Sequence, residues 1–305
     1  MAARYQVEHT TKYVYVSPVA TSQHVAYLRP RELPYQHVSY HDLHIDPAPA
    51  SGSRRADSFG NIVNHFQILR PHSTLLVTSE SQVEVCARSE IDIDGSPRWE
   101  AVSRELSGRT TSMPPDVAQF AHPSPYLPFS EAMRRFARPS FGTGAPMLRG
   151  AVELMRRMHE QFTFDSRATT VTTPLSRVLD DRRGVCQDFA HVAISCLRAL
   201  GLAARYVSGY LLTDPPPGQP RLIGADASHA WLSVYCPLNG WVDLDPTNNV
   251  VAGERHVTVA WGRDYGDVSP LRGVLLGGAS HRLFVGVSVL PVEAAGPAGP
   301  VRSSD

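Results

Sequence analysis

The stretch from Arg183 to Gly201 constrains the fold of this chain more than any other. Cys186 stands near its beginning, a largely apolar run follows, and Gly201 supplies the left-handed residue that commonly ends a helix. The unpaired N–H groups of a first helical turn carry partial positive charge, which favours the thiolate form of a cysteine. The pattern therefore predicts a helix over residues 185–200 that presents a nucleophilic sulfur at its start.

The two faces of this helix have different compositions. A helical wheel, at about 100° per residue, places Cys186 on the apolar side above small alanines, where a sheet can approach closely. Asp188 and His191 fall on the opposite side, with His191 about 140° from Cys186, so the three residues cannot converge on one zinc ion. We interpret Asp188 and His191 as structural hydrogen-bonding residues, and the base that activates Cys186 has to come from elsewhere.

A predicted hairpin further along the chain offers a histidine and an aspartate. The strand-like runs His229–Tyr235 and Trp241–Asp245 are joined across the turn-forming stretch Pro237–Gly240. If the runs pair at residues 235 and 241, His229 and Asp245 share one face as diagonal neighbours. Their backbones are then about 7–8 Å apart, a separation that a His–Asp hydrogen bond can bridge.

Cys186, His229 and Asp245 together have the chemistry of a nucleophile, a base and the group that orients the base. In such a site the sulfur attacks an amide carbonyl, and the Cys186 N–H with a neighbouring N–H holds the oxyanion. Two structural interpretations compete with this one: Cys186 as a buried core cysteine, and His229 as a histidine packed beside a tryptophan.

The first 90 residues have the alternation of an antiparallel β-sandwich. Strand-like runs at residues 4–16, 38–45, 62–69 and 75–85 are separated by Pro- and Gly-rich turns. The region also holds seven histidines, but without the spacing of paired metal ligands, and we interpret them as surface or strand-face residues. These are His9, His24, His37, His41, His44, His65 and His72.

The remaining chain divides into a connecting region at 91–150, a core at 151–292 and a disordered tail at 293–305. The acidic stretch Glu90–Gly95 resembles the start of a calcium loop, but Ala101 stands at the twelfth position, where such a loop needs a glutamate. We interpret it as a turn. No metal or other cofactor is predicted.

Composition excludes several functions. The formal net charge is zero and the sequence pI is about 7.2, which gives no support to a nucleic-acid partner. A glycine-rich phosphate loop is missing, as are a secretory leader and an apolar run long enough to span a membrane. The four cysteines include no C-x-x-C pair. We expect a cytoplasmic protein with free cysteines and no membrane partner.

The motifs of the second half are similar to those of the bacterial transglutaminase-like family, and residues 1–90 resemble the β-rich domain that precedes the family's catalytic core. The resemblance covers about residues 1–290 and implies an α+β fold in which the N-terminal β-sandwich is followed by a papain-like core. The triad cysteine, histidine and aspartate of the family map onto Cys186, His229 and Asp245. The matching segments are Gly184–His191, Tyr206–Tyr210, His229–Trp231, Gly240–Asn248 and Gly262–Gly273, with His9–Tyr13, Pro30–Arg31 and Asp57–Asn61 in the N-terminal region.

This family includes transglutaminases, proteases, peptide amidases and inactive scaffolds. The resemblance therefore implies acyl transfer from a peptide or protein amide through a cysteine thioester to water or an amine, and we expect it to be independent of calcium. The alternative is a non-catalytic protein-binding scaffold that retains the fold. The sequence does not reveal the substrate, the acceptor or the oligomeric state.

Overall fold

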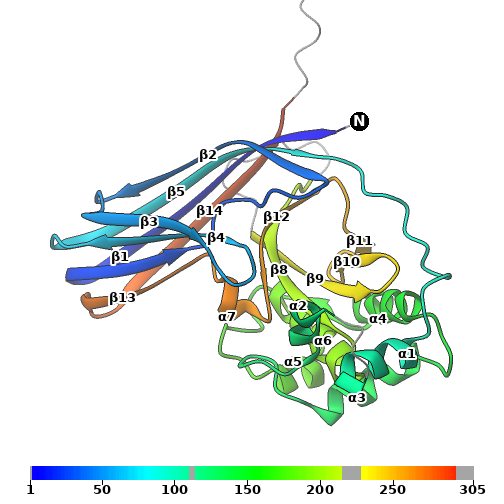
Figure 1. Ribbon diagram of the computed structural model, residues 1–305. Coiled ribbons are helices and arrows are strands. Elements are labelled where there is room, and N and C mark those ends of the chain that lie inside the picture. The colour runs from blue at the N-terminus through cyan, green and yellow to red at the C-terminus, as the bar shows by residue number, and fades with distance from the viewer. Residues whose placement is uncertain (1, 110–113, 215–227, 293–305) are drawn as a thin grey trace, which may run out of the picture.

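The computed structural model describes residues 2–109, 114–214 and 228–292, and it has the expected α+β fold. A curled antiparallel sheet projects from one side of a second, helix-backed sheet (Figure 1). Within these residues no helix is long and apolar enough to cross a membrane. The tail predicted at 293–305 lies outside the described residues.

The seven-stranded curled sheet is organised around one long strand, β1, which spans 24 residues. The first half of β1 pairs with β5 and β14, and its second half pairs with β4 and β13, so the sheet has two halves that share this strand. Apolar side chains between the halves form a small core of their own. The strands are β1 Ala3–Ala26, β2 Gln36–Asp46, β3 Ser51–Ala56, β4 Ile62–Ile68, β5 His72–Val85, β13 Leu271–Gly277 and β14 His281–Pro291.

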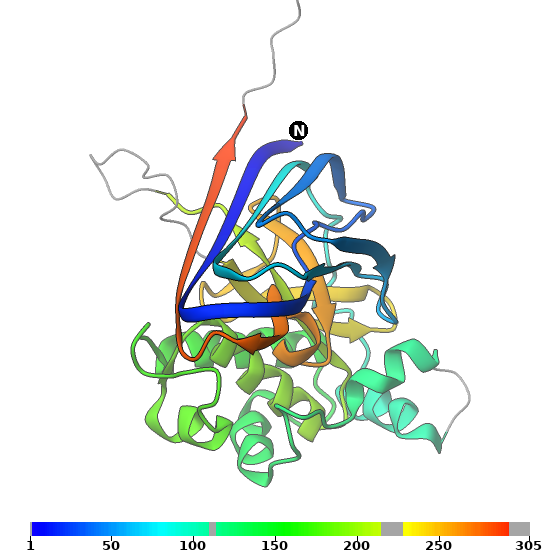
Figure 2. The ribbon, with the colours of Figure 1, turned by 90° about the vertical axis from the view of Figure 1, so that its left-hand side faces the viewer.

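The composition of this sheet differs from the expectation in two respects. Sequence patterning misses β3, whose six residues are all exposed and therefore lack any apolar alternation. It also assigns residues 271–291 to the core at 151–292, whereas β13 and β14 pair with β1. Figure 2 shows β14 running beside β1, so both ends of the chain build the same sheet.

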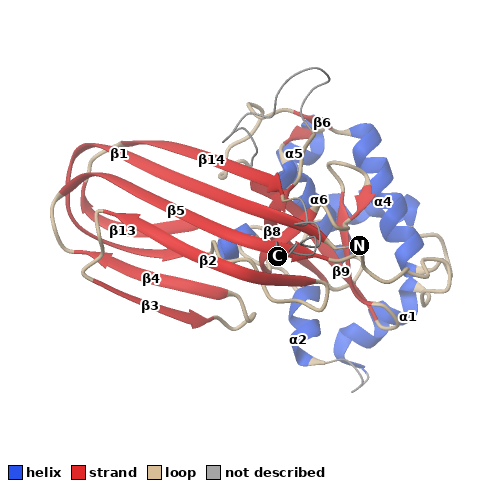
Figure 3. Ribbon diagram, turned by 90° about the horizontal axis from the view of Figure 1, so that it is seen from above, coloured by secondary structure: helices blue, strands red, loops and turns tan. Residues whose placement is uncertain are grey.

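The second sheet has the order β11-β10-β9-β8-β12, and helices cover one of its faces (Figure 3). Its strands are β8 Ala204–Leu211, β9 Ser228–Cys236, β10 Gly240–Asp245, β11 Val250–Val251 and β12 His256–Gly262; a separate pair is formed by β6 Thr163–Phe164 and β7 Arg183–Gly184. The helices are α1 Trp99–Arg104, α2 Pro115–Ala118, α3 Glu131–Ala137, α4 Met147–Gln161, α5 Leu175–Asp181, α6 Cys186–Ala199 and α7 Tyr265–Val268, with a π-helical turn at Glu105–Arg109 and 3₁₀ turns at Gln119–Ala121 and Arg138–Ser140.

Helix α6 is buried on its polar side as well as on its apolar side. Asp188, His191 and Arg198 are each less than a tenth exposed. The Arg198 guanidinium donates to the carbonyls of Phe120, Ala204 and Arg263. One side chain thus ties the helix to the connecting region, to β8 and to the segment before α7.

The N-terminal sheet attaches to the free edge of β12 through two side-chain amides. Gln36 Nε2 donates to the Thr258 carbonyl and Gln36 Oε1 accepts from the Thr258 N–H, both at 2.8 Å. Asn61 repeats this pattern on Trp261, with distances of 2.8 and 3.0 Å. Each amide takes the place of a neighbouring strand residue, so this part of the edge has its backbone groups satisfied.

Two smaller predictions concern local structure. The stretch predicted as a turn does turn, at residues 93–96, and the Gly95 N–H donates to Asp92 Oδ1 at 2.8 Å. Among the seven N-terminal histidines, His9, His24 and His72 are buried strand-face residues rather than surface ones. His9 also contacts the core, where its Nδ1 lies 2.9 Å from the Tyr210 hydroxyl.

Candidate active site

The start of α6 is fixed by hydrogen bonds to Asp188. Its Oδ2 accepts from the Val185 N–H at 2.9 Å and from the Thr169 hydroxyl at 2.6 Å. A Cβ on Gly184 would lie 2.6 Å from the same oxygen, so the chain needs glycine just before the helix. Asp188 is therefore a structural residue that holds the backbone from which the Cys186 side chain projects.

Cys186 begins α6 and is only partly buried. Its side chain lies close enough to His229, at the start of β9, to contribute to the raised pKa of that imidazole. Because His229 Nε2 is engaged by Asp245, the ring nitrogen available to the sulfur is Nδ1. The thiol belongs to the first residue of α6 and the imidazole to the beginning of β9. They meet where α6 faces the sheet.

The hairpin has the predicted register. Trp241 pairs with Tyr235, and Leu244 pairs with Leu232, which places Asp245 diagonal to His229. The His229 Nε2–H donates to Asp245 Oδ2 across 2.7 Å. The structure thus brings together the three residues predicted from the sequence, and their catalytic role stays a prediction.

Asp245 accepts more hydrogen bonds than the triad requires. Its Oδ1 accepts from the N–H groups of Thr247 at 3.0 Å and Asn248 at 3.2 Å. Its Oδ2 accepts from Asn248 Nδ2 at 2.7 Å and from His256 Nε2 at 3.2 Å, in addition to His229. A fully buried carboxylate with this many donors is held ionised and in one orientation.

His256 is the residue that sequence reasoning missed. It begins β12 and is almost completely buried, with its ring at a T-shaped contact to Trp231. The Gly253 N–H donates to its Nδ1 at 3.4 Å, which leaves the proton on Nε2 for Asp245. His256 follows Asp245 by 11 residues, after the short strand β11, and no spacing pattern in the sequence marks this contact.

The electrostatics of the site favour a charged imidazole. Burial alone would lower the pKa of His229, but hydrogen bonds to Asp245 and Cys186 and the negative charges of both raise it to about 10. Burial would likewise raise the pKa of Asp245, whereas its bonds to His229, His256 and Asn248 hold it well below the usual range. The arrangement thus stabilises a charged His229 imidazole against the ionised Asp245.

Two family models match this chain. The model of the bacterial transglutaminase-like N-terminal region matches residues 5–84, and that of the transglutaminase-like superfamily matches residues 134–246. An uncharacterized protein of Mycobacterium tuberculosis is 42% identical over 299 residues, which are 95% of this chain and 93% of that protein. The chain belongs to the bacterial transglutaminase-like family.

Two further relatives of this transglutaminase-like chain have more informative names. A protein-glutamine gamma-glutamyltransferase of Pseudomonas aeruginosa is 29% identical over 168 residues, 54% of this chain and 22% of that protein. The crystal structure of a candidate cysteine protease from Cytophaga hutchinsonii has a TM-score of 0.72 at 20% identity and covers 96% of this chain and 93% of its own. The second likeness shows a shared fold that extends over 96% of this chain.

The surroundings of Cys186 in this transglutaminase-like core are otherwise structural. His191 Nε2 accepts from the Tyr265 N–H at 3.1 Å, and burial lowers its pKa to about 4. Tyr206 is fully buried close to the sulfur; burial first, and then the charge of Cys186, raise its pKa well above the ordinary value. His191 and Tyr206 are thus both neutral at physiological pH, and neither competes with His229 as the base.

The donor atoms of His229, Asp245 and His256 lie within 4.8 Å of one another, close enough for a metal ion. Both imidazoles, however, point an Nε2 toward the same oxygen, Oδ2 of Asp245. Hydrogen bonds to one oxygen account for this geometry, since a metal would need the nitrogen lone pairs that these protons occupy. We therefore describe the group as a hydrogen-bonded cluster.

Proposed function

We propose that this protein is a cysteine-dependent acyltransferase that cleaves a side-chain or main-chain amide of a peptide or protein. The observation that supports the proposal is the continuous contact from Cys186 through His229 to Asp245, with Asp245 buried and saturated by donors. Family membership supports the same chemistry, and the Pseudomonas relative carries the name of a glutamine-modifying enzyme.

In the first step the Cys186 thiolate attacks the amide carbonyl carbon and forms a tetrahedral intermediate. The Cys186 N–H is among the first N–H groups of α6, which have no acceptor within the helix and can donate to the oxyanion. The imidazolium of His229 then protonates the leaving nitrogen, the C–N bond breaks, and ammonia or an amine leaves a thioester on Cys186.

In the second step water or a primary amine attacks the thioester while His229 takes one proton from it. The C–S bond breaks, and the thiolate–imidazolium pair is restored. Water gives a carboxylic acid, which corresponds to deamidation or proteolysis. An amine gives a new amide, which corresponds to transamidation. Both acceptors use the same residues, so the choice between them depends on access to the thioester.

Mass spectrometry of glutamine-containing peptides, with and without a primary amine, tests the proposal. Deamidation adds about 1 Da, transamidation replaces ammonia with the amine, and proteolysis shortens the peptide. In Cys186→Ala the rate at which any of these products forms should fall by a factor of about 10³ or more. Cys86→Ala, which removes an exposed cysteine, is the matched control and should retain full activity. Normal turnover by a folded Cys186→Ala protein would exclude the mechanism.

A non-catalytic scaffold is the competing function. A scaffold would not form a thioester, so an amide-mimicking electrophile should label Cys186 in the enzyme and leave it unmodified in a scaffold. Calcium independence also stays a prediction, to be tested as turnover in EDTA. Cytoplasmic location stays a prediction as well.

A further inference from the structure

The exposed face of one half of the curled sheet contains a groove of about 610 Å³. It lies across β3, β4, the second half of β1 and β13, so both ends of the chain contribute to it. A volume of this size is typical of ligand sites. The site around Cys186 contributes no lining residue to this groove, which is thus separate from the proposed chemistry.

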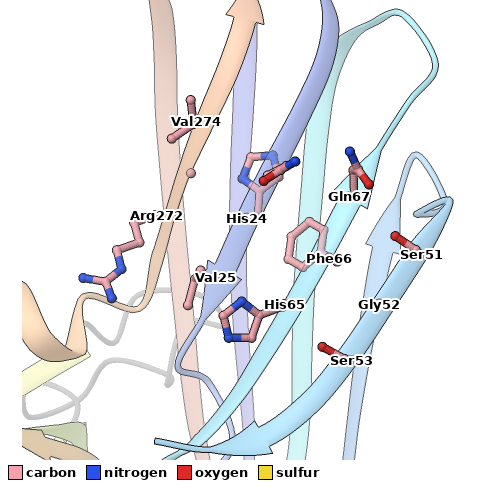
Figure 4. A pocket seen from close by; sticks show the side chains of 12 residues that line it. His24, Val25, Ser51, Gly52, Ser53, His65, Phe66, Gln67, Arg272 and Val274 are labelled. Carbon is pink, nitrogen blue, oxygen red and sulfur yellow. The ribbon is translucent and has the colours of Figure 1, made fainter.

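Two rows of side chains cross the groove, as the strand register dictates. One row consists of Ser51, Gln67, Gln23 and Val274, and the neighbouring row consists of Ser53, His65, Val25 and Arg272. Figure 4 shows Arg272, Val25, His65 and Ser53 in order across the strands, with Gln67 and Ser51 beside them. One row thus carries amides, and the other carries an imidazole and a guanidinium at two separate positions.

The charges in the groove are of one sign. None of the 12 lining residues is an aspartate or a glutamate. Arg55, on the same face of β3, donates from Nε to His65 Nε2 at 3.1 Å, which leaves the His65 proton on Nδ1. Burial first, and then the charges of Arg55 and Arg272, lower the pKa of His65. Positive groups clustered without a carboxylate in the lining fit an anionic ligand.

The amides indicate what kind of anion. Gln23 and Gln67 are direct cross-strand partners, and their side chains make no hydrogen bond to another residue in the described part of the chain. Elsewhere in this molecule, Gln36 and Asn61 use the same side-chain group to bind a strand backbone through both its N–H and its C=O. Gln23 and Gln67 offer that two-point contact to an extended chain.

The only aromatic carbocycle in the lining, Phe66, is buried and so offers no stacking surface for a sugar or a base.

We propose that this groove binds an extended acidic peptide segment, with Gln23 and Gln67 on its backbone and Arg272 and the Arg55–His65 pair on its carboxylates. His65 and Arg272 stand two strands apart, about 10 Å between backbones, and alternate residues of an extended chain are about 7 Å apart. The length of an arginine side chain covers the difference. The ligand therefore carries acidic residues at alternate positions.

Fluorescence anisotropy of a labelled peptide in which glutamate alternates with serine tests the proposal. The full-length Cys186→Ala protein is used, so that turnover cannot consume the probe and failure of the proposed function does not affect the result. We expect binding that weakens about tenfold when glutamine replaces glutamate in the peptide, when Gln23 and Gln67 are both changed to alanine, or when Arg55→Gln is introduced.

Arg54→Gln is the matched control, because Arg54 is the neighbouring residue on β3, carries the same charge and lies on the opposite face of the strand. It should bind as the parent does, and thermal unfolding establishes that each variant is folded. Equal weakening by Arg54→Gln would overturn the proposal in favour of diffuse charge. No binding, or tighter binding of a sulfated glycan that does not depend on Gln23 and Gln67, would also overturn it.

Discussion

The cluster around Asp245 and the groove on the curled sheet are both rich in polar side chains, but they use them in opposite ways. At Asp245 the hydrogen-bonding capacity of the carboxylate is filled by residues of the protein itself. In the groove the amides of Gln23 and Gln67 have no partner among the described residues. A buried group has to be satisfied internally, and the result is a fixed geometry. An exposed group is satisfied by water until a ligand replaces that water.

The largest effect should come from removing the charge of Asp245. Asp245→Asn keeps the shape of the side chain but disfavours the charged imidazole, and we expect turnover to fall by about 10³–10⁴. Asp243→Asn is the same substitution two residues earlier on β10. Asp243 pairs with Arg88 at 2.8 Å in a buried site, so this variant should lose about 3–5 kcal/mol of unfolding free energy while the folded fraction stays active. Turnover assays combined with denaturant unfolding separate the two; equal loss of turnover would contradict the roles assigned here.

His256 should have the next largest effect. His256→Phe removes one donor from Asp245, and because a hydrogen bond to a charged group contributes about 1.5–3 kcal/mol, we expect turnover to fall about 10- to 100-fold. His256→Gln retains an N–H donor and should recover part of the loss. The His229 resonances in an NMR titration provide the decisive readout, since a lower pKa in His256→Phe indicates positioning through Asp245. An unchanged pKa with reduced turnover would indicate another role for His256.

The pH dependence of stability should distinguish the cluster from the rest of the protein. The pKa of His229 is raised to about 10 from its ordinary 6.5, so the folded state binds its proton more tightly than the unfolded state does. This contribution is complete below pH 6.5 and is lost as the pH rises toward 10. Unfolding free energies measured across that interval should fall in the parent, and His229→Gln should fall less steeply. Parallel curves would mean that the imidazolium is not stabilised by folding.

The smallest effect is expected in the groove. Changing Gln23 and Gln67 together to alanine removes no internal hydrogen bond, so the thermal unfolding midpoint should move by no more than about 2 °C, as is usual for surface substitutions. Changing Gln36 to alanine, by contrast, removes the acceptor of the buried Thr258 N–H, whereas the Thr258 carbonyl still accepts from the Arg31 N–H. One unsatisfied buried group costs about 1–3 kcal/mol. Calorimetry should therefore give a much larger drop in the thermal unfolding midpoint for the Gln36 variant than for the variant that lacks Gln23 and Gln67.

The sequence predicts much of the candidate site because its determinants are local. Helix α6 follows from an apolar periodicity that ends at Gly201, and the contact of His229 with Asp245 follows from the register of one hairpin. His256 could not be predicted in this way, because no spacing pattern marks its return to Asp245 after the short strand β11, although only 11 residues separate the two. The placement of β13 and β14 fails for a different reason. Pairing between strands hundreds of residues apart depends on the packing of the whole chain, which a window of neighbouring residues does not contain.

The pairing of the first strand with the last has a consequence for how the protein is made. Tyr13 of β1 pairs with Leu283 of β14, and 270 residues separate them. At a synthesis rate of about 5–20 residues per second, the edge of β1 that receives β14 stays open for roughly 15–55 s after it leaves the ribosome. During that interval a nascent chain exposes a long, partly apolar strand edge to its neighbours. We expect C-terminal truncations to aggregate even though every residue around Cys186 is retained, and production to depend on chaperones that protect the open edge until the last strand arrives.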